Sequence, residues 1–120
     1  MSSPVKGSYL LIAYLAQAQP VSVGRLGEIY FHAGWYAYVG SAMGGLEGRI
    51  ARHLRSSKRL HWHIDYLLRV AGIERVVKFE SEIRIECAIA EVLRKDFAGV
   101  PRFGCSDCRC PSHLFYINPV

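Results

Sequence analysis

The sequence lacks an apolar run long enough to cross a membrane as a helix. Its longest run, residues 9–16, has the length of a strand, whereas a membrane helix needs roughly 20 apolar residues. The first six residues also lack the charged start, the apolar stretch and the cleavage site of a signal peptide. We therefore expect a cytoplasmic protein, in which the four cysteines are not expected to form structural disulfides.

Internal repeats, low-complexity tracts and linkers are also absent, so we expect one domain over residues 1–120. Hydrophobic residues make up 51% of the composition, which excludes a disordered chain and can supply a core. Fifteen Lys and Arg against 10 Asp and Glu give a formal net charge of +5. One short basic stretch favours a polyanionic partner; it contains Arg49, Arg52, His53, Arg55, Lys58 and Arg59.

The first third of the chain has the pattern of β-strands. Residues 8–15 are rich in strand formers and predict a largely buried strand. Two short runs, residues 21–23 and 28–31, flank a glycine-containing turn at residues 24–27 and predict a hairpin. A further strand is predicted at residues 35–39, so this part of the chain has the pattern of an antiparallel meander.

Apolar residues then recur at helical spacing. Leu46, Ile50 and Leu54 lie four apart and predict a helix with one apolar stripe. A second helix is predicted at about residues 61–70, and a strand follows at residues 73–79.

A third helix is predicted after Ser81, which is a plausible N-cap. It extends to about Asp96, and its apolar stripe consists of Ile85, Ala88, Ile89, Val92 and Leu93. The remainder, residues 99–120, has the composition of a cysteine-rich loop closed by a short strand at residues 114–117. The order of elements predicts a small α+β fold with three helices.

Side chains suited to phosphate chemistry occur in these elements. Strand alternation places Tyr36 and Tyr38 on one face, and Tyr9 joins them if the two strands pair. Arg49 and His53 share a neighbouring stripe of the first helix. Together with a carboxylate such as Glu86 for a hard cation, such groups suit phosphodiester hydrolysis. The residues alone fit equally a packed strand and a solvated helix face.

Several segments resemble a known family. Gly7-Ser-Tyr9, Tyr38-Val-Gly40, Gly45-Leu-Glu-Gly-Arg49 and a helix glutamate resemble the GIY-YIG nuclease domain. Residues 36–42, 52–55, 60–68 and 106–116 resemble its DUF123 branch, which is found mainly in archaea. The resemblance covers nearly the whole chain and implies a central antiparallel sheet flanked by helices.

The resemblance also implies a mechanism, in which DNA is cut with one Mg²⁺ or Mn²⁺ held by a helix glutamate. The implied catalytic residues are Tyr9, Tyr38, Arg49, His53 and Glu86, with Glu86 as the ligand of the divalent cation. Gly40 matches the motif glycine, and the expected nucleic-acid contacts are Gly40, Arg52, Arg55, Lys58 and His61. A guanidinium such as that of Arg49 can bind two phosphate oxygens at once.

The chain departs from the family pattern at two places. Ser8 stands where the first motif has isoleucine, and an extra hairpin at residues 21–31 separates the two motif halves. Whether this hairpin covers the site or restricts its substrates stays open at this point. Glu82 competes with Glu86 for the metal, because it lies one turn earlier on the same predicted face; the sequence context favours Glu86.

The remaining polar residues admit alternatives. His61 and His63 diverge by about 200° on a helix and cannot chelate one ion well, whereas His61 and Asp65 can hydrogen-bond across one turn. His63 can instead pack against the sheet. In the last loop, a zinc site is conceivable at Cys105, Cys108, Cys110 and His113. Asp107 or His113 could complete the substrate site, and Cys87 is interpreted as a small core residue.

From the sequence we expect a metal-dependent endonuclease that hydrolyses DNA phosphodiesters, with a structure-specific, repair-related role and a DNA-repair protein as a possible partner. RNA stays open as a substrate. One alternative is a nucleic-acid-binding accessory module that does not cut. Another is a zinc-stabilised interaction domain, which depends only on the Cys/His loop.

Overall fold

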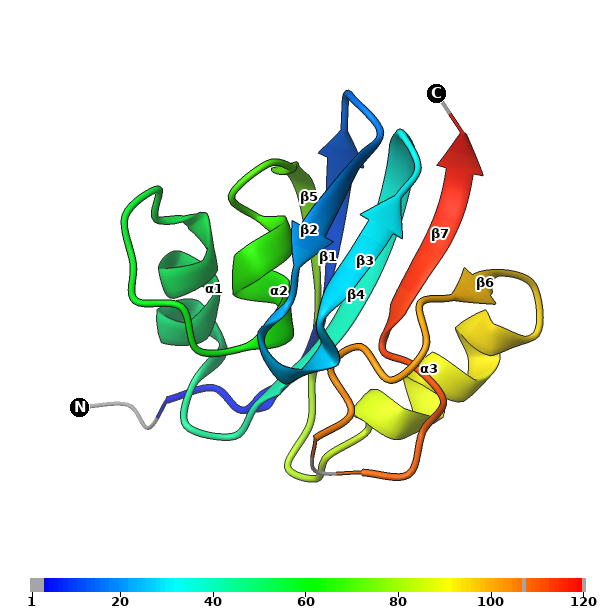
Figure 1. The fold of residues 1–120 in the computed structure, drawn as a ribbon. Helices are drawn as coiled ribbons and strands as arrows, with labels where there is room; N and C mark the ends of the chain where they lie inside the picture. Colours follow the sequence, from blue (N-terminus) through cyan, green and yellow to red (C-terminus); the bar gives the residue numbers. More distant parts are fainter. Residues whose placement is uncertain (1–3, 107, 120) are drawn as a thin grey trace.

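The computed structural model describes residues 4–106 and 108–119, which form an α+β fold around an antiparallel sheet (Figure 1). The sheet has five strands in the order β5-β1-β4-β7-β6. Their bounds are β1 Gly7–Leu15, β4 Gly34–Ala42, β5 Gly72–Glu80, β6 Ala98–Gly99 and β7 Leu114–Pro119. The predicted fold class is therefore confirmed. In the described residues no helix has both the length and the apolar character of a membrane span.

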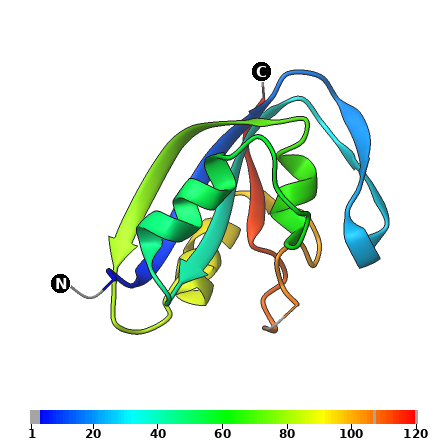
Figure 2. The same ribbon diagram turned by 90° about the vertical axis from the view of Figure 1, so that its left-hand side faces the viewer.

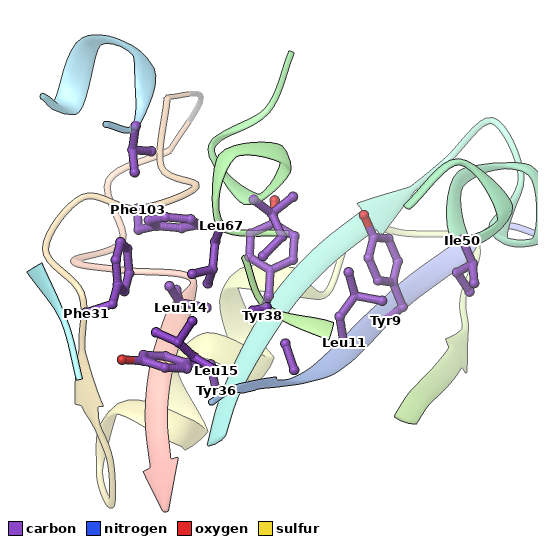
Figure 3. Close-up of a cluster of buried hydrophobic side chains, with 14 of the residues drawn as sticks. Tyr9, Leu11, Leu15, Phe31, Tyr36, Tyr38, Ile50, Leu67, Phe103 and Leu114 are labelled. Carbon is purple, nitrogen blue, oxygen red and sulfur yellow. The ribbon is translucent and has the colours of Figure 1, made fainter. Parts of the chain in front are cut away.

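Helices cover both faces of the sheet (Figures 1 and 2). Helices α1 (Leu46–Leu54) and α2 (His63–Leu67) pack on one face, and α3 (Glu86–Arg94) packs on the other. Tyr38 belongs to the first core and its neighbour Val39 to the second, as expected for alternating side chains of a strand. Figure 3 shows Tyr9, Tyr36 and Tyr38 together in the first core, so the predicted common face is confirmed.

The extra hairpin stands apart from the main sheet. Its strands β2 (Gln19–Ser22) and β3 (Glu28–Phe31) pair only with each other and are joined by the 3₁₀ turn Gly24–Leu26. The predicted meander is wrong, because β1 pairs directly with β4 along its whole length. The physical reason is that β1 is apolar on both faces and gains a neighbour on each edge. The hairpin contributes Phe31 to the first core without joining the sheet, and Phe31 packs there on Tyr36 and Phe103.

The helix stripes differ in part from the prediction. Leu54 is 57% exposed, whereas His53 is 2% exposed. Counted from Leu46 at about 100° per residue, His53 returns to within about 20° of the buried direction and Leu54 lies about 80° away. Helical periodicity therefore puts a histidine, in place of a leucine, against the sheet.

The third helix starts later than predicted. Ile85 occupies the N-cap position, and the Ser81 hydroxyl instead accepts the backbone N–H of Ile83 in the preceding turn. In α3 it is Ala90 that is buried, while Val92 is exposed. The late start matters for the site, because Glu86 becomes the first residue of α3.

Candidate functional site

A cavity of about 90 Å³ lies where β1 begins and β4 ends. Its volume is several times the roughly 10–15 Å³ that one water needs. The residues that line it are Tyr9, Tyr38, Gly40, Ser41, Arg49, Trp62, Arg84, Glu86, Gly104, Cys108 and His113. Five of the residues singled out for catalysis or DNA contact thus meet at one place: Tyr9, Tyr38, Gly40, Arg49 and Glu86.

Gly40 is required by the way Tyr9 packs. The two residues are register partners on β1 and β4, and the ring of Tyr9 lies across the Gly40 backbone. A Cβ atom on Gly40 would overlap the Tyr9 ring, with even Cε2 only 2.7 Å away. The motif glycine therefore makes room for the motif tyrosine, and contact with nucleic acid is not needed to explain it.

Tyr9 and His53 form a buried polar pair. The Tyr9 Oη and His53 Nε2 atoms are hydrogen-bonded at 2.7 Å. Burial raises the pKa of Tyr9 to about 12, although the neighbouring Arg49 guanidinium opposes this rise. Burial lowers the pKa of His53 to about 4, so the imidazole is neutral near pH 7. A neutral imidazole with an unprotonated Nε2 can accept this hydrogen bond, which fixes the direction of the Tyr9 hydroxyl.

The other ring nitrogen of His53 has a different environment. Among the described residues, His53 Nδ1 is the one buried side-chain polar atom without a hydrogen-bond partner. Such an atom costs free energy and is tolerated at sites where a group is held ready for chemistry. His53 lies beneath Tyr9, and it reaches the cavity through that hydroxyl.

Arg49 is held in place by two contacts. Its Nη1 donates to the backbone oxygen of Ser41 at 2.8 Å, and its guanidinium carbon lies 4.4 Å from the centre of the Trp62 ring. Because a guanidinium carries five N–H donors, the contact with Ser41 leaves others for an anion in the cavity. Arg49 is thus held with N–H donors directed at the cavity, and Trp62, which the sequence analysis did not single out, supports it.

The two candidate metal ligands, Glu86 and Glu82, lie in different environments. The Glu86 side chain is 19% exposed and lines the cavity, with one oxygen 3.5 Å from Arg84 Nη1. Glu82 is 89% exposed and lies near Lys6 outside the cavity. A carboxylate beside the Tyr9 and Tyr38 hydroxyls is a set of hard oxygen donors, which fits Mg²⁺ or Mn²⁺ when water and phosphate oxygens complete the shell. The preference for Glu86 over Glu82 therefore agrees with the geometry.

Arg52 and Lys58, two of the residues expected to contact DNA, make hydrogen bonds within the protein. Arg52 donates to both carboxylate oxygens of Asp65, at 3.0 and 3.1 Å, and stacks 4.3 Å from the centre of the Trp62 ring. Lys58 Nζ donates to the backbone oxygens of His53 and Arg55 and so caps the end of α1. Only Arg55 of these three cations is an exposed side chain on a helix end.

Asp65 is the centre of this network. It is fully buried and accepts the backbone N–H groups of His61 and Trp62 at 2.8 and 2.9 Å. Burial alone raises its pKa, but the bonds from Arg52, Trp62 and His61 outweigh this and hold the pKa below its usual value. The expected bond between the His61 and Asp65 side chains is thus replaced by one from the His61 backbone, and the His61 side chain is exposed.

His63 fixes the C-terminal loop. Its Nδ1 accepts the backbone N–H of Gly104 at 2.8 Å, and its ring packs on Phe103 with centroids 5.6 Å apart. The expected packing on the sheet is replaced by packing on this loop. Gly104 in turn has a φ of +76°, and a Cβ atom there would lie 3.1 Å from a Tyr38 ring carbon. His63 therefore holds in place a glycine against which Tyr38 packs.

A group of thiols and one imidazole adjoins the cavity. The ligand atoms of Cys87, Cys108, Cys110 and His113 all lie within 4.8 Å of one another, a group that could hold a metal ion such as zinc. Cys87 thus takes the place in this group that was predicted for Cys105. The interpretation of Cys87 as a small core residue is wrong, because Cys87 is exposed. Cys105 is not one of these four mutually close ligand atoms: its thiol lies beside that of Cys108 but donates to the Phe103 backbone oxygen at 3.4 Å. Partial burial of the thiol raises the pKa of Cys87 to about 12, so without a metal its side chain is a thiol at neutral pH.

The hairpin does not cover the cavity. None of the described residues of β2, β3 and their turn lines it. Instead, Arg25 and Leu26 line a separate cavity of about 410 Å³ with His63, Arg102, Cys105 and Ser106. Asp107, considered for the substrate site, lies outside the described residues.

The fold and site define a small α+β protein whose polar cavity gathers tyrosines, an arginine and a carboxylate beside a Cys/His cluster. The chain belongs to the DUF123 family: the family model described as "Domain of unknown function DUF123" matches residues 8–120. Searches of curated proteins and of solved structures returned no match.

Proposed function

We propose that this protein is a metal-dependent endonuclease that hydrolyses DNA phosphodiester bonds, and that it belongs with the GIY-YIG nucleases. The observation that carries the proposal is the convergence of Tyr9, Tyr38, Arg49 and Glu86 on one cavity from separate elements. Packing alone explains buried tyrosines, but it gives no reason for a carboxylate and a guanidinium to face them.

The chain's own residues divide the chemical work. Arg49 binds the phosphate oxygens and stabilises the charge that develops on them. Tyr9 orients the attacking water through its hydroxyl, which the hydrogen bond to the buried, neutral His53 holds in place. Tyr38, buried on the same face, shapes the wall of the cavity and presents its hydroxyl there.

Glu86 is the residue that would hold Mg²⁺ or Mn²⁺. The bound cation would supply positive charge at the phosphate and lower the pKa of water. Glu86 stands at the first turn of α3, where its side chain lines the cavity.

The test is cleavage of labelled duplex, single-stranded, flap and branched DNA in Mg²⁺ or Mn²⁺. We compare the wild type with Glu86→Gln and with Glu82→Gln, a matched control on an exposed side chain. The wild type is expected to cut, Glu82→Gln to keep its rate, and Glu86→Gln to lose about 100-fold or more, the effect of roughly 3 kcal/mol on the barrier.

Two outcomes contradict the proposal. Equal rates for Glu86→Gln and the wild type would remove Glu86 from the reaction. If the wild type binds DNA but cuts no substrate in either metal, the protein is a nucleic-acid-binding module without nuclease activity.

A further inference from the structure

We propose that Cys87, Cys108, Cys110 and His113 bind one Zn²⁺ ion in a tetrahedral site. The ion would join the C-terminal loop to the first turn of α3. This inference goes beyond the nuclease proposal and does not depend on it, because metal binding by these residues can be measured without any cleavage.

The positions of the ligand atoms fit zinc. With Zn–S near 2.3 Å and Zn–N near 2.0–2.1 Å, neighbouring ligands of a tetrahedral ion lie about 3.5–3.8 Å apart. His113 Nε2 lies 3.6 Å from Cys108 Sγ and 3.8 Å from Cys87 Sγ. All four ligand atoms lie within 4.8 Å of one another, so side-chain shifts of about 1 Å complete the site.

The thiols and imidazole of this group do not suit Mg²⁺ or Mn²⁺, the cations expected at Glu86. Thiolates and imidazole favour zinc, whereas Mg²⁺ and Mn²⁺ prefer carboxylate, phosphate and water oxygens. Glu86 and Cys87 are neighbours at the start of α3, yet the first lines the cavity and the second joins the thiol cluster. One helical turn therefore presents ligands for two different metals.

The backbone already holds the ligands in place. The N–H of His113 donates to Phe103 and its carbonyl accepts from Val39 of β4, at 2.8 and 2.9 Å. Pro111, which follows Cys110, accepts the N–H of Arg102 at 2.8 Å. Since Cys87 stands on a helix, and since these bonds fix His113 and the residue after Cys110, part of the ligand set is held in place before any ion binds, which lowers the entropic cost of binding.

Cys105 provides a matched control. It belongs to the same loop, but its thiol contacts the Phe103 carbonyl and lines the cavity that contains Arg25. Replacing it therefore removes a cysteine of similar position and chemistry without removing a proposed ligand.

The first test is metal analysis of protein purified from zinc-supplemented cells. The wild type and Cys105→Ser are expected to carry about one zinc per chain, and Cys87→Ser a tenth of that or less. Glu86→Gln is expected to keep its zinc, which distinguishes this site from the nuclease site. If Cys105→Ser loses as much zinc as Cys87→Ser, the assignment is overturned.

The second test needs no variant, and so it stands even if Cys87→Ser fails to fold. Metal-stripped wild-type protein is titrated with Co²⁺, which in a tetrahedral thiolate site gives strong visible bands and a near-ultraviolet charge-transfer band. Saturation at one equivalent, reversed by Zn²⁺, supports the site. A wild type that holds no zinc and develops no such bands, or that carries a disulfide among these cysteines, refutes it.

Discussion

Replacing Gly40 by alanine is expected to disturb the cavity at its most crowded point. The new Cβ atom would overlap the ring of Tyr9, whose hydroxyl is bonded to His53. The ring is 1% exposed, so it cannot simply swing into solvent. It must shift within the core, and its bond to His53 must lengthen or break.

The magnitude follows from these contacts. Overpacking of a core costs about 1–3 kcal/mol, and losing a hydrogen bond between buried groups costs about 1–3 kcal/mol. Alanine is better than glycine inside a strand by roughly 0.5–1 kcal/mol, which offsets part of the loss. We therefore expect Gly40→Ala to lower the free energy of unfolding by about 1–5 kcal/mol, or the Tm by roughly 4 °C per kcal/mol.

Two controls isolate the cause. Gly48, on the surface of α1, has open space around its Cα, and Gly48→Ala should leave stability unchanged or raise it by up to about 1 kcal/mol. In a Tyr9→Ala background the ring is gone, so adding Gly40→Ala should cost less than it does alone.

Stability is measured by urea and thermal unfolding of the four variants and the wild type. The reasoning is refuted if Gly40→Ala melts within about 2 °C of the wild type, a shift of roughly 0.5 kcal/mol. It also fails if the costs of Gly40→Ala and Tyr9→Ala simply add, since the overlap would then not be the cause.

Two further predictions concern the basic stretch. Asp65→Asn should lower the free energy of unfolding, measured in urea, by about 2–4 kcal/mol. This is toward the lower end of the cost of breaking a buried ion pair, because the Arg52 side chain is 19% exposed. Because the folded pKa of Asp65 is lowered, the wild type should lose this stability as the pH falls below about 4, and Asp65→Asn should not; parallel pH profiles would contradict this. Arg55→Gln should weaken DNA binding alike for different sequences and reduce the slope of log K against log salt by about 0.9, measured by fluorescence anisotropy; an unchanged slope would remove Arg55 from the interface.

The part of the site that could be predicted is the part governed by local periodicity and motif. Alternation along the strands placed Tyr9 and Tyr38 on one face, and the resemblance to the motifs of a known family pointed to Arg49, Gly40 and Glu86. These predictions needed only the pairing of β1 with β4, which the buried pattern of β1 favours.

The part that could not be predicted depends on contacts between distant segments. Cys87 meets Cys108 and Cys110 because α3 begins beside the C-terminal loop, and no spacing in the chain reveals this. The hydrogen bonds that Arg52 and Lys58 make within the protein depend on how the segment after α1 folds back. His53 is different, because a strict 3.6-residue period from Leu46 would have predicted its burial.

The position of the extra hairpin determines where the chain can change in length. Leu15 and Gly34, where β1 ends and β4 begins, are paired with each other, so residues 16–33 form one long loop that leaves and re-enters the sheet at a single point. Its length can therefore vary without shifting Tyr9 relative to Gly40. The exposed turn at residues 24–27 is accordingly a position for inserting a foreign peptide, and Val23 and Phe31, buried in the core, are the residues that an insertion must keep.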